Sequence, residues 1–125
     1  KEIKKNYPQI KIKTLPGISS LSFAAALGDF QLIKKGENLN IIECPDEKSQ
    51  FLDLINKKRK TVLAIMKVGK RWEWVKYILE EKKILRKAIL AVNLGMKNQY
   101  IGDASEYLLK ELPYFSLLLL RIDLE

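Results

Sequence analysis

The feature that most constrains the fold is the almost uninterrupted apolar run at residues 61–68, TVLAIMKV. A strand that is apolar on both sides must be covered on both faces, which is typical of a central strand in an α/β sheet. A second run of this kind lies at residues 87–94, KAILAVNL, and ends at Gly95. Two such strands in one chain predict a layered domain in which helices cover the sheet.

Amphipathic segments separate these runs and define the remaining elements. Three further strands are predicted at residues 9–15, 39–44 and 114–123. The segment after Gly69 places apolar residues three and four positions apart, as in a helix that buries one face. Strands and helices therefore alternate along the chain, which predicts one α/β domain with a five-stranded mixed sheet and about four helices. Helices are expected at residues 19–27, 46–59 and 103–112, and after Gly69-Lys70 in the segment that carries Trp72, Val75, Ile78 and Leu79.

The composition excludes several kinds of chemistry. The 125 residues are enough for one domain with an ordinary core. There is no histidine, which excludes Ser-His and Cys-His nucleophile pairs and His-ligated zinc. The single cysteine, Cys44, excludes an intramolecular disulfide and a Cys-rich metal site. Without a histidine to activate it, Cys44 is expected to be a small buried hydrophobic residue, and no metal site is expected.

The start of the chain indicates no targeting signal. KEIKKNYP has a charged beginning without the apolar region of a signal peptide. The longest purely apolar run, residues 117–120, is far too short to span a bilayer. We therefore expect a reduced cytoplasmic protein with no membrane partner. The chain opens at Lys1 rather than at Met, and we expect it to be part of a longer product.

The net charge of +8 at a sequence pI near 9.5 suggests affinity for polyanions. The basic residues are dispersed at the predicted ends of elements, which favours a solvated surface or an anionic small substrate over nucleic acid. Trp72 and Trp74 could stack on bases, but the helical spacing favours Trp72 as a core residue and Trp74 as a partly covered one.

Ligands of open α/β sheets bind at the carboxyl ends of the strands, and four such strand-end sequences are distinctive here. Each of the four sequences also has a plain structural interpretation. In chain order, these interpretations are a capped Gly turn, a core Met beside a surface Lys, a polar loop, and core aromatics. Taken one at a time, the structural interpretation is favoured. The four are PGISS at residues 16–20, MKVG at 66–69, NLGM at 93–96 and PYFS at 113–116.

Together these strings resemble the C-terminal half of the tetrapyrrole (corrin and porphyrin) methylases, which use S-adenosylmethionine as methyl donor. The resemblance begins with IKTLPGISSLSFAAALGDFQL and covers the chain from about residue 8 to its end. The match looks most like the branch that acts on precorrin-2 or cobalt-precorrin-2 in cobalamin biosynthesis. The matching segments are residues 12–32, 36–39, 62–69, 91–99 and 113–122.

The resemblance implies which residues meet the cofactor. Ser19 and Ser20 match the Thr/Ser–Ala/Ser pair that follows Pro-Gly, and Met66 matches a Met that packs on the cofactor. Gly95 matches the Gly of a loop near the adenine. Ser116 and Leu117 fall where the last strand contributes backbone contacts. The methyl transfer is a direct displacement that depends on positioning, so the absence of histidine is compatible with it and the catalytic residues are left unassigned.

The resemblance also implies partners. The family has two α/β domains with the active site between them, and the Gly-rich loops of its N-terminal half do not occur in this chain. We therefore expect residues 1–125 to be the C-terminal domain, inactive without the other half. A tetrapyrrole substrate and a homodimer are implied as partners, and nucleic acid is not. Gln31 departs from the Pro that many members have before Leu32.

Two other functions stay open at this point. A small basic α/β module could bind nucleic acid through Trp and Lys side chains on one face. A non-catalytic domain could keep the fold for ligand sensing or assembly. The first predicts salt-sensitive binding to oligonucleotides, and the second predicts cofactor binding by this chain alone.

Overall fold

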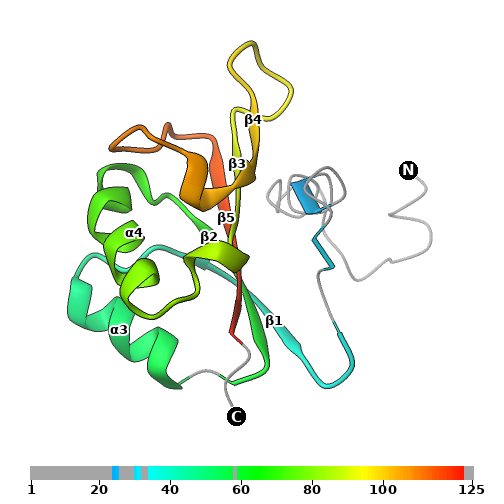
Figure 1. Cartoon of the computed structure of the whole chain (residues 1–125), viewed down its shortest axis with the longest axis vertical. Helices are drawn as coiled ribbons and strands as arrows, with labels where there is room; N and C mark the ends of the chain where they lie inside the picture. Colours follow the sequence, from blue (N-terminus) through cyan, green and yellow to red (C-terminus); the bar gives the residue numbers. More distant parts are fainter. Residues whose placement is uncertain (1–23, 26–29, 32–33, 58, 123–125) are drawn as a thin grey trace.

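A sheet with two helices against one face organises the chain (Figure 1). The computed structural model describes residues 24–25, 30–31, 34–57 and 59–122. Within them the predicted α/β class and the five-stranded mixed sheet are confirmed. The predicted strand at residues 9–15 lies outside the described residues. Of the predicted helix at residues 19–27, only Ala24 and Ala25 are described, and both are helical.

The sheet mixes parallel and antiparallel pairs. The strand order is β1-β2-β5-β3-β4, in which β1 and β2 are parallel and all other neighbours are antiparallel. The carboxyl ends of β1, β2 and β3 therefore lie at the same end of the sheet as the first residues of β4 and β5. The strands are β1 (Asn38–Glu43), β2 (Thr61–Met66), β3 (Ile89–Val92), β4 (Tyr100–Asp103) and β5 (Ser116–Ile122).

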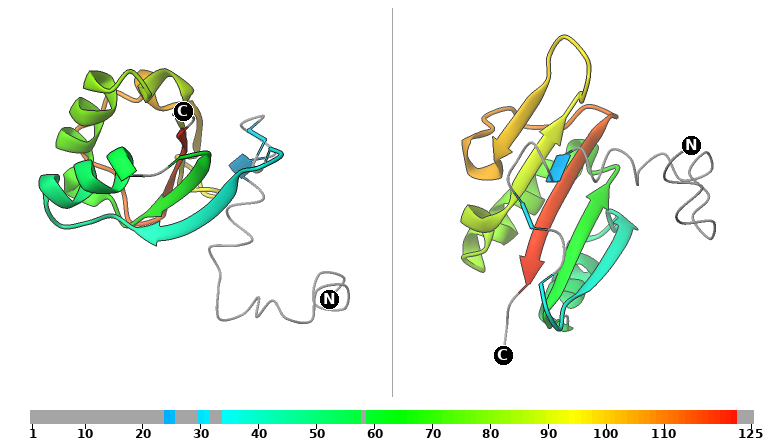
Figure 2. Two further views of the ribbon diagram at one scale, coloured as in Figure 1. Left: turned by 90° about the horizontal axis from the view of Figure 1, so that it is seen from below. Right: turned by 90° about the vertical axis from the view of Figure 1, so that its right-hand side faces the viewer.

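The helices α3 (Lys48–Lys57) and α4 (Trp72–Glu81) cover the same face of the sheet (Figures 1 and 2). Among the described residues, neither helix has the length and apolar character needed to cross a membrane. The predicted apolar stripe of α4 is confirmed, because each of its members is buried. These members are Trp72, Val75, Ile78 and Leu79.

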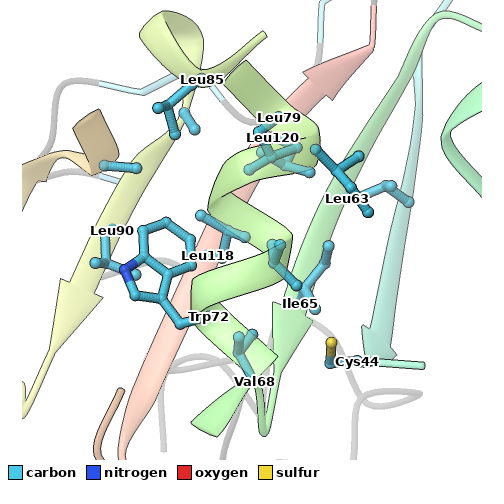
Figure 3. Close-up of a cluster of buried hydrophobic side chains, with 14 of the residues drawn as sticks. Cys44, Leu63, Ile65, Val68, Trp72, Leu79, Leu85, Leu90, Leu118 and Leu120 are labelled. Atoms are coloured by element: carbon cyan, nitrogen blue, oxygen red, sulfur yellow. The ribbon is translucent and has the colours of Figure 1, made fainter. Parts of the chain in front are cut away.

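The main core forms between these helices and the sheet (Figure 3). Side chains alternate across a strand, so Leu63 and Ile65 of β2 point to the helices while Ala64 points to the second face. Every residue of β2 up to Ile65 is buried, which confirms the prediction of a central strand. A fully buried aliphatic side chain of this kind contributes about 1.5–3 kcal/mol.

The second face of the sheet carries smaller side chains. Ala64, Ala91, Leu117 and Leu119 form a buried cluster there with Ala24 and Ala25. Small residues on both sides let the chain approach the sheet closely. The predicted role of the Ala-rich segment in close packing is thus confirmed for the two alanines that the structure describes.

One predicted helix is wrong. The segment expected to be helical at residues 103–112 forms only a short 3₁₀ turn, Ala104–Glu106, with no side-chain cap from Asp103. Tyr107 leaves the turn in an extended conformation, where its ring meets Tyr100 at 5.2 Å and its carbonyl accepts a hydrogen bond from Lys76 Nζ at 2.8 Å. These tertiary contacts outweigh the local helix preference.

Strand β4 also differs from the prediction, which placed no strand there. It pairs antiparallel with β3, Val92 lying opposite Tyr100 and Ile89 opposite Asp103. Tyr100 stabilises this edge, because its hydroxyl donates to the Asp103 carbonyl at 2.7 Å. Strand β3 is correspondingly shorter than the predicted residues 87–94.

A buried ion pair joins the start of β1 to the end of β5. Arg121 Nε donates to Glu37 Oε2 at 2.7 Å, and Arg121 Nη2 donates to Glu37 Oε1 at 3.2 Å. The two side chains are only 12% and 5% exposed. Arg121 also donates to the carbonyl of Gln31 and lies over the ring of Phe30 at 4.8 Å. The guanidinium thus holds the chain before β1 against the last strand.

We expect Glu37→Gln to lower the free energy of unfolding by roughly 2 kcal/mol, because it leaves the Arg121 guanidinium without its anion in a buried position. Urea unfolding of the two proteins measures the difference. Glu80→Gln, on the exposed surface of α4, is the matched control and should change stability by less than about 0.5 kcal/mol. Equal effects of the two substitutions would contradict the conclusion that the Glu37–Arg121 pair stabilises the fold.

The same pair predicts a pH dependence. The hydrogen bond from Arg121 lowers the pKa of Glu37 below its ordinary value of 4.5, and burial opposes this shift. The stabilisation is therefore present above pH 4.5 and is lost as the pH falls through the lower pKa of the folded protein. Unfolding measured from pH 7 downwards should show the stability gap between the wild type and Glu37→Gln closing in this range.

Candidate functional site

Three strands bring the predicted site residues together at one end of the sheet. Met66, the last residue of β2, lies opposite Leu117 of β5. Leu117 also lies opposite Ala91 of β3, and Ser116 lies opposite Val92. Met66, Ser116 and Leu117, predicted from separate stretches of sequence, are thus immediate neighbours.

The side chains of Met66 and Leu117 share the second face of the sheet. Leu117 is 5% exposed, and Met66 packs against the same cluster while remaining partly exposed. Leu94, just beyond the end of β3, packs there as well. A flexible thioether next to these leucines is an apolar surface that can adapt to a flat heterocycle.

The loop before β5 is held by its own hydrogen bonds. The Ser116 hydroxyl donates to the Pro113 carbonyl at 3.0 Å, and the Ser116 N–H donates to the Tyr114 carbonyl at 3.1 Å. The Asn93 N–H donates to the Phe115 carbonyl at 2.7 Å, which ties this loop to the end of β3. The Ser116 side chain therefore shapes the strand end.

The exits of β2 and β3 repeat one backbone pattern. Lys67 directly follows β2 with φ 59°, and Gly69 has φ 55°. Asn93 directly follows β3 with φ 52°, and Gly95 has φ 78°. Each strand thus ends in two left-handed residues separated by one other residue, and β5 lies between the two exits. Asn and Gly tolerate this conformation, whereas Lys is strained in it.

Gly95 is required by its backbone angle and not by crowding. A Cβ atom at Gly95 would meet no atom within 4 Å. Its N–H donates to Gln99 Oε1 at 2.7 Å, and the Met96 N–H donates to the Asn93 carbonyl at 2.9 Å. These two bonds close the loop between β3 and β4, and the open space over Gly95 leaves room for a ligand to approach the backbone.

Two ion pairs line the same end of the sheet. Lys67 Nζ lies 3.2 Å from Glu43 Oε2, and the Arg71 guanidinium contacts Asp46. The hydrogen bond and the charge of Glu43 raise the pKa of Lys67, with a smaller contribution from Tyr114. Both pairs are exposed on at least one side, so they are weak contributors to stability.

The aromatic residues before β5 are exposed, so the prediction that they belong to the core is wrong. Tyr114 is 71% and Phe115 is 61% exposed, and their rings meet edge to face at 5.1 Å. The physical reason is that the last strand pair is Val92 with Ser116; the hydrogen bond from Asn93 then fixes the Phe115 backbone, but no strand of the described chain continues beside the two rings to cover them. The chain leaves the sheet there with both rings in solvent.

Other candidates resolve as structural residues. Burial raises the pKa of the Cys44 thiol to about 11, which confirms a buried, unreactive cysteine. Trp72 is 1% exposed, and Trp74 packs edge to face on Phe51 at 5.8 Å, so the predicted placement of both is confirmed and Trp72 cannot stack on a base. Within the described part of the chain, no cluster of acidic or Cys side chains could hold a metal ion.

Ser19 and Ser20 lie outside the described residues. The remaining predicted cofactor residues, Met66, Gly95, Ser116 and Leu117, lie at one end of the sheet. The left-handed backbone conformation of Lys67 and Asn93 was not predicted from the sequence. The only available signal was the preference of Asn for this conformation, and nothing in the sequence indicated it for Lys67.

The family follows from comparison with known proteins. Residues 1–108 match the family model of the Tetrapyrrole (Corrin/Porphyrin) Methylases, and this chain belongs to that family. A search of curated proteins gave no match. The family consists of S-adenosylmethionine-dependent methyltransferases.

The residues at the strand ends fit such a cofactor in chemical type. Met66 offers a partly exposed, polarisable surface for an adenosyl group beside the buried Leu117, and the glycine at position 95 leaves its backbone uncovered. No charged side chain lies buried at this end among the described residues, so a neutral purine can pack there without desolvating an ion.

We expect Gly95→Ala to lower the free energy of unfolding by about 1 kcal/mol, because Ala is strained at a φ of 78° although space is available for its Cβ. Thermal unfolding measures the change. Gly102→Ala in β4 is the control: its φ is ordinary, and the added Cβ would meet the Tyr100 side chain at van der Waals distances of 3.4 to 3.9 Å. A larger loss at position 102 than at position 95 would contradict this account.

Proposed function

We propose that this chain is the C-terminal part of an S-adenosylmethionine-dependent C-methyltransferase that acts on precorrin-2 or cobalt-precorrin-2 in cobalamin biosynthesis. The family match over residues 1–108 supports the methyltransferase class. The MKVG and PYFSLLLLRI segments, which resemble the precorrin-2 C(20)-methyltransferases, support the substrate. The observation that carries the proposal is the meeting of these two segments, with Met66 opposite Leu117.

Each residue of the site then has a task. Met66 packs on the adenosyl part of the cofactor, Leu117 contributes backbone contacts, and Gly95 lets the backbone of its loop approach the base. Ser19 and Ser20 offer hydroxyl groups to the same ligand. When bound, the cofactor supplies an electrophilic methyl group on a sulfonium. The protein holds the nucleophilic carbon of the macrocycle in line with it, and this positioning can lower the barrier without an acid–base residue.

A second domain completes the site in this proposal. A small-molecule site normally buries most of its ligand, whereas the strand ends described here form one wall. The opposite wall would come from an N-terminal domain, as the resemblance implies. Residues 1–125 alone are therefore expected to bind the cofactor weakly and to lack methyl transfer activity.

Calorimetric titration with S-adenosylhomocysteine tests the proposal. The chain should bind weakly by itself and at least about tenfold more tightly when the N-terminal half of a tetrapyrrole methylase is added. Met66→Ala should weaken binding in the mixture by roughly tenfold, because it removes apolar contact with the ligand. Leu108→Ala, at an exposed side chain outside the four strand-end sequences, is the control.

The titration separates the functional classes. The absence of binding both with and without the added half would count against a methyltransferase. Binding that is equally tight in both conditions would favour a ligand-sensing domain that needs no partner.

A further inference from the structure

Lys67 holds an unusual position in the site. It immediately follows Met66, its φ of 59° is left-handed, and its side chain is 52% exposed. Left-handed non-glycine residues are strained and are concentrated at functional sites. Strain alone does not single out Lys67, because Lys60 and Lys83 share it. What distinguishes Lys67 is that it lies at the end of β2 where the cofactor residues gather.

The ammonium group of Lys67 is free to change partners. Its contact with Glu43 is 3.2 Å long, and the Glu43 side chain is 66% exposed. An exposed pair of this kind is held only weakly, so another carboxylate can replace Glu43 at little cost. Lys67 is protonated at neutral pH, because the ordinary pKa of a lysine lies well above 7 and Glu43 raises the pKa of Lys67 further.

Exposed aromatic rings lie at the same end of the sheet as this cation. Tyr114 and Phe115 come just before β5, whose residue Leu117 lies opposite Met66, and the two rings meet at 5.1 Å. Aromatic residues that remain 71% and 61% exposed provide apolar area that nothing in the described chain covers. A cation and two uncovered rings at one end of a sheet are chemically suited to a large conjugated ring system that carries carboxylates on its edge.

We propose that Lys67 binds a peripheral carboxylate of the tetrapyrrole, while Tyr114 and Phe115 pack against the macrocycle. This assignment rests on the proposed function and names the substrate contact of that same site. Glu43 holds Lys67 in place in the free protein and gives way to the substrate. A carboxylate could also come from the amino acid part of the cofactor, so the test measures both ligands.

The test uses the chain mixed with the N-terminal half of a tetrapyrrole methylase. The probes are uroporphyrin III, an octacarboxylate porphyrin, followed by fluorescence quenching, and S-adenosylhomocysteine, followed by calorimetry. Lys67→Gln should weaken porphyrin binding by about three- to tenfold and leave the second ligand unchanged. Lys60→Gln is the matched control, because Lys60 is an exposed, left-handed lysine at the opposite end of β2 with the same charge.

Two further variants separate binding from a structural role. Lys67→Arg keeps the charge and should retain most of the porphyrin affinity. Glu43→Gln removes the competing carboxylate and should tighten porphyrin binding about twofold or more, but only while Lys67 is present. If Lys67 and Glu43 merely supported the fold, Glu43→Gln would weaken binding or leave it unchanged.

The remaining outcomes overturn the assignment in different ways. Equal losses in Lys67→Gln and Lys60→Gln would indicate general surface charge. A loss confined to S-adenosylhomocysteine would place the cofactor's carboxylate on Lys67. Failure of the wild-type mixture to bind the porphyrin would also exclude the assignment, whereas failure to bind S-adenosylhomocysteine would count against the proposed function itself.

Discussion

The pairing of β5 with both β2 and β3 is the constraint on which the rest of the structure depends. The last strand of the chain enters the middle of the sheet, antiparallel to each neighbour. Its first residues, Ser116 and Leu117, consequently lie beside the carboxyl ends of two strands that precede it by many residues. This insertion makes a single site from segments that are separate in sequence, and it gives β5 a buried face on each side.

The ion pairs at the two ends of the sheet differ in their exposure to solvent. At one end the Arg121–Glu37 pair is almost fully enclosed and ties the chain before β1 to the last strand. At the other end the Lys67–Glu43 pair is exposed and can be exchanged. The first arrangement suits stability, because removing one partner would leave the other charge buried without its counter-ion. The second suits binding, because its charges stay solvated and available for a ligand.

The family of this chain and the resemblance of its strand ends point to the same place in the molecule. Family membership establishes the chemical class of the enzymes, S-adenosylmethionine-dependent methyltransferases. Proximity of Met66 and Leu117 across β2 and β5 supplies the physical basis for a cofactor wall. The substrate proposal adds the exposed rings of Tyr114 and Phe115, which no consideration of core packing explains.

The local sequence pattern was sufficient to predict those elements whose formation is dominated by the burial of apolar side chains. The apolar run of β2 and the stripe of α4 were predictable, because burial of many side chains with one periodicity leaves few alternatives. Strand β4 and the turn at Ala104 were not, because no local periodicity sets them: β4 forms by pairing with β3, and the chain after the turn contacts Tyr100 and Lys76 of α4. Tyr107 illustrates this: its ring and carbonyl bind Tyr100 and Lys76, and a helix at residues 103–112 is lost as a result.

The sequence by itself determined the α/β class, the buried strands, the unreactive Cys44 and the candidate residues Met66, Gly95, Ser116 and Leu117. Only the tertiary structure decided that β5 lies between β2 and β3, that Lys67 is left-handed, and that Tyr114 and Phe115 face solvent. The physical reason is that burial patterns are local properties of a chain. Strand order, and the backbone angles where strands end, depend on which distant segments compete for the same edge of the sheet.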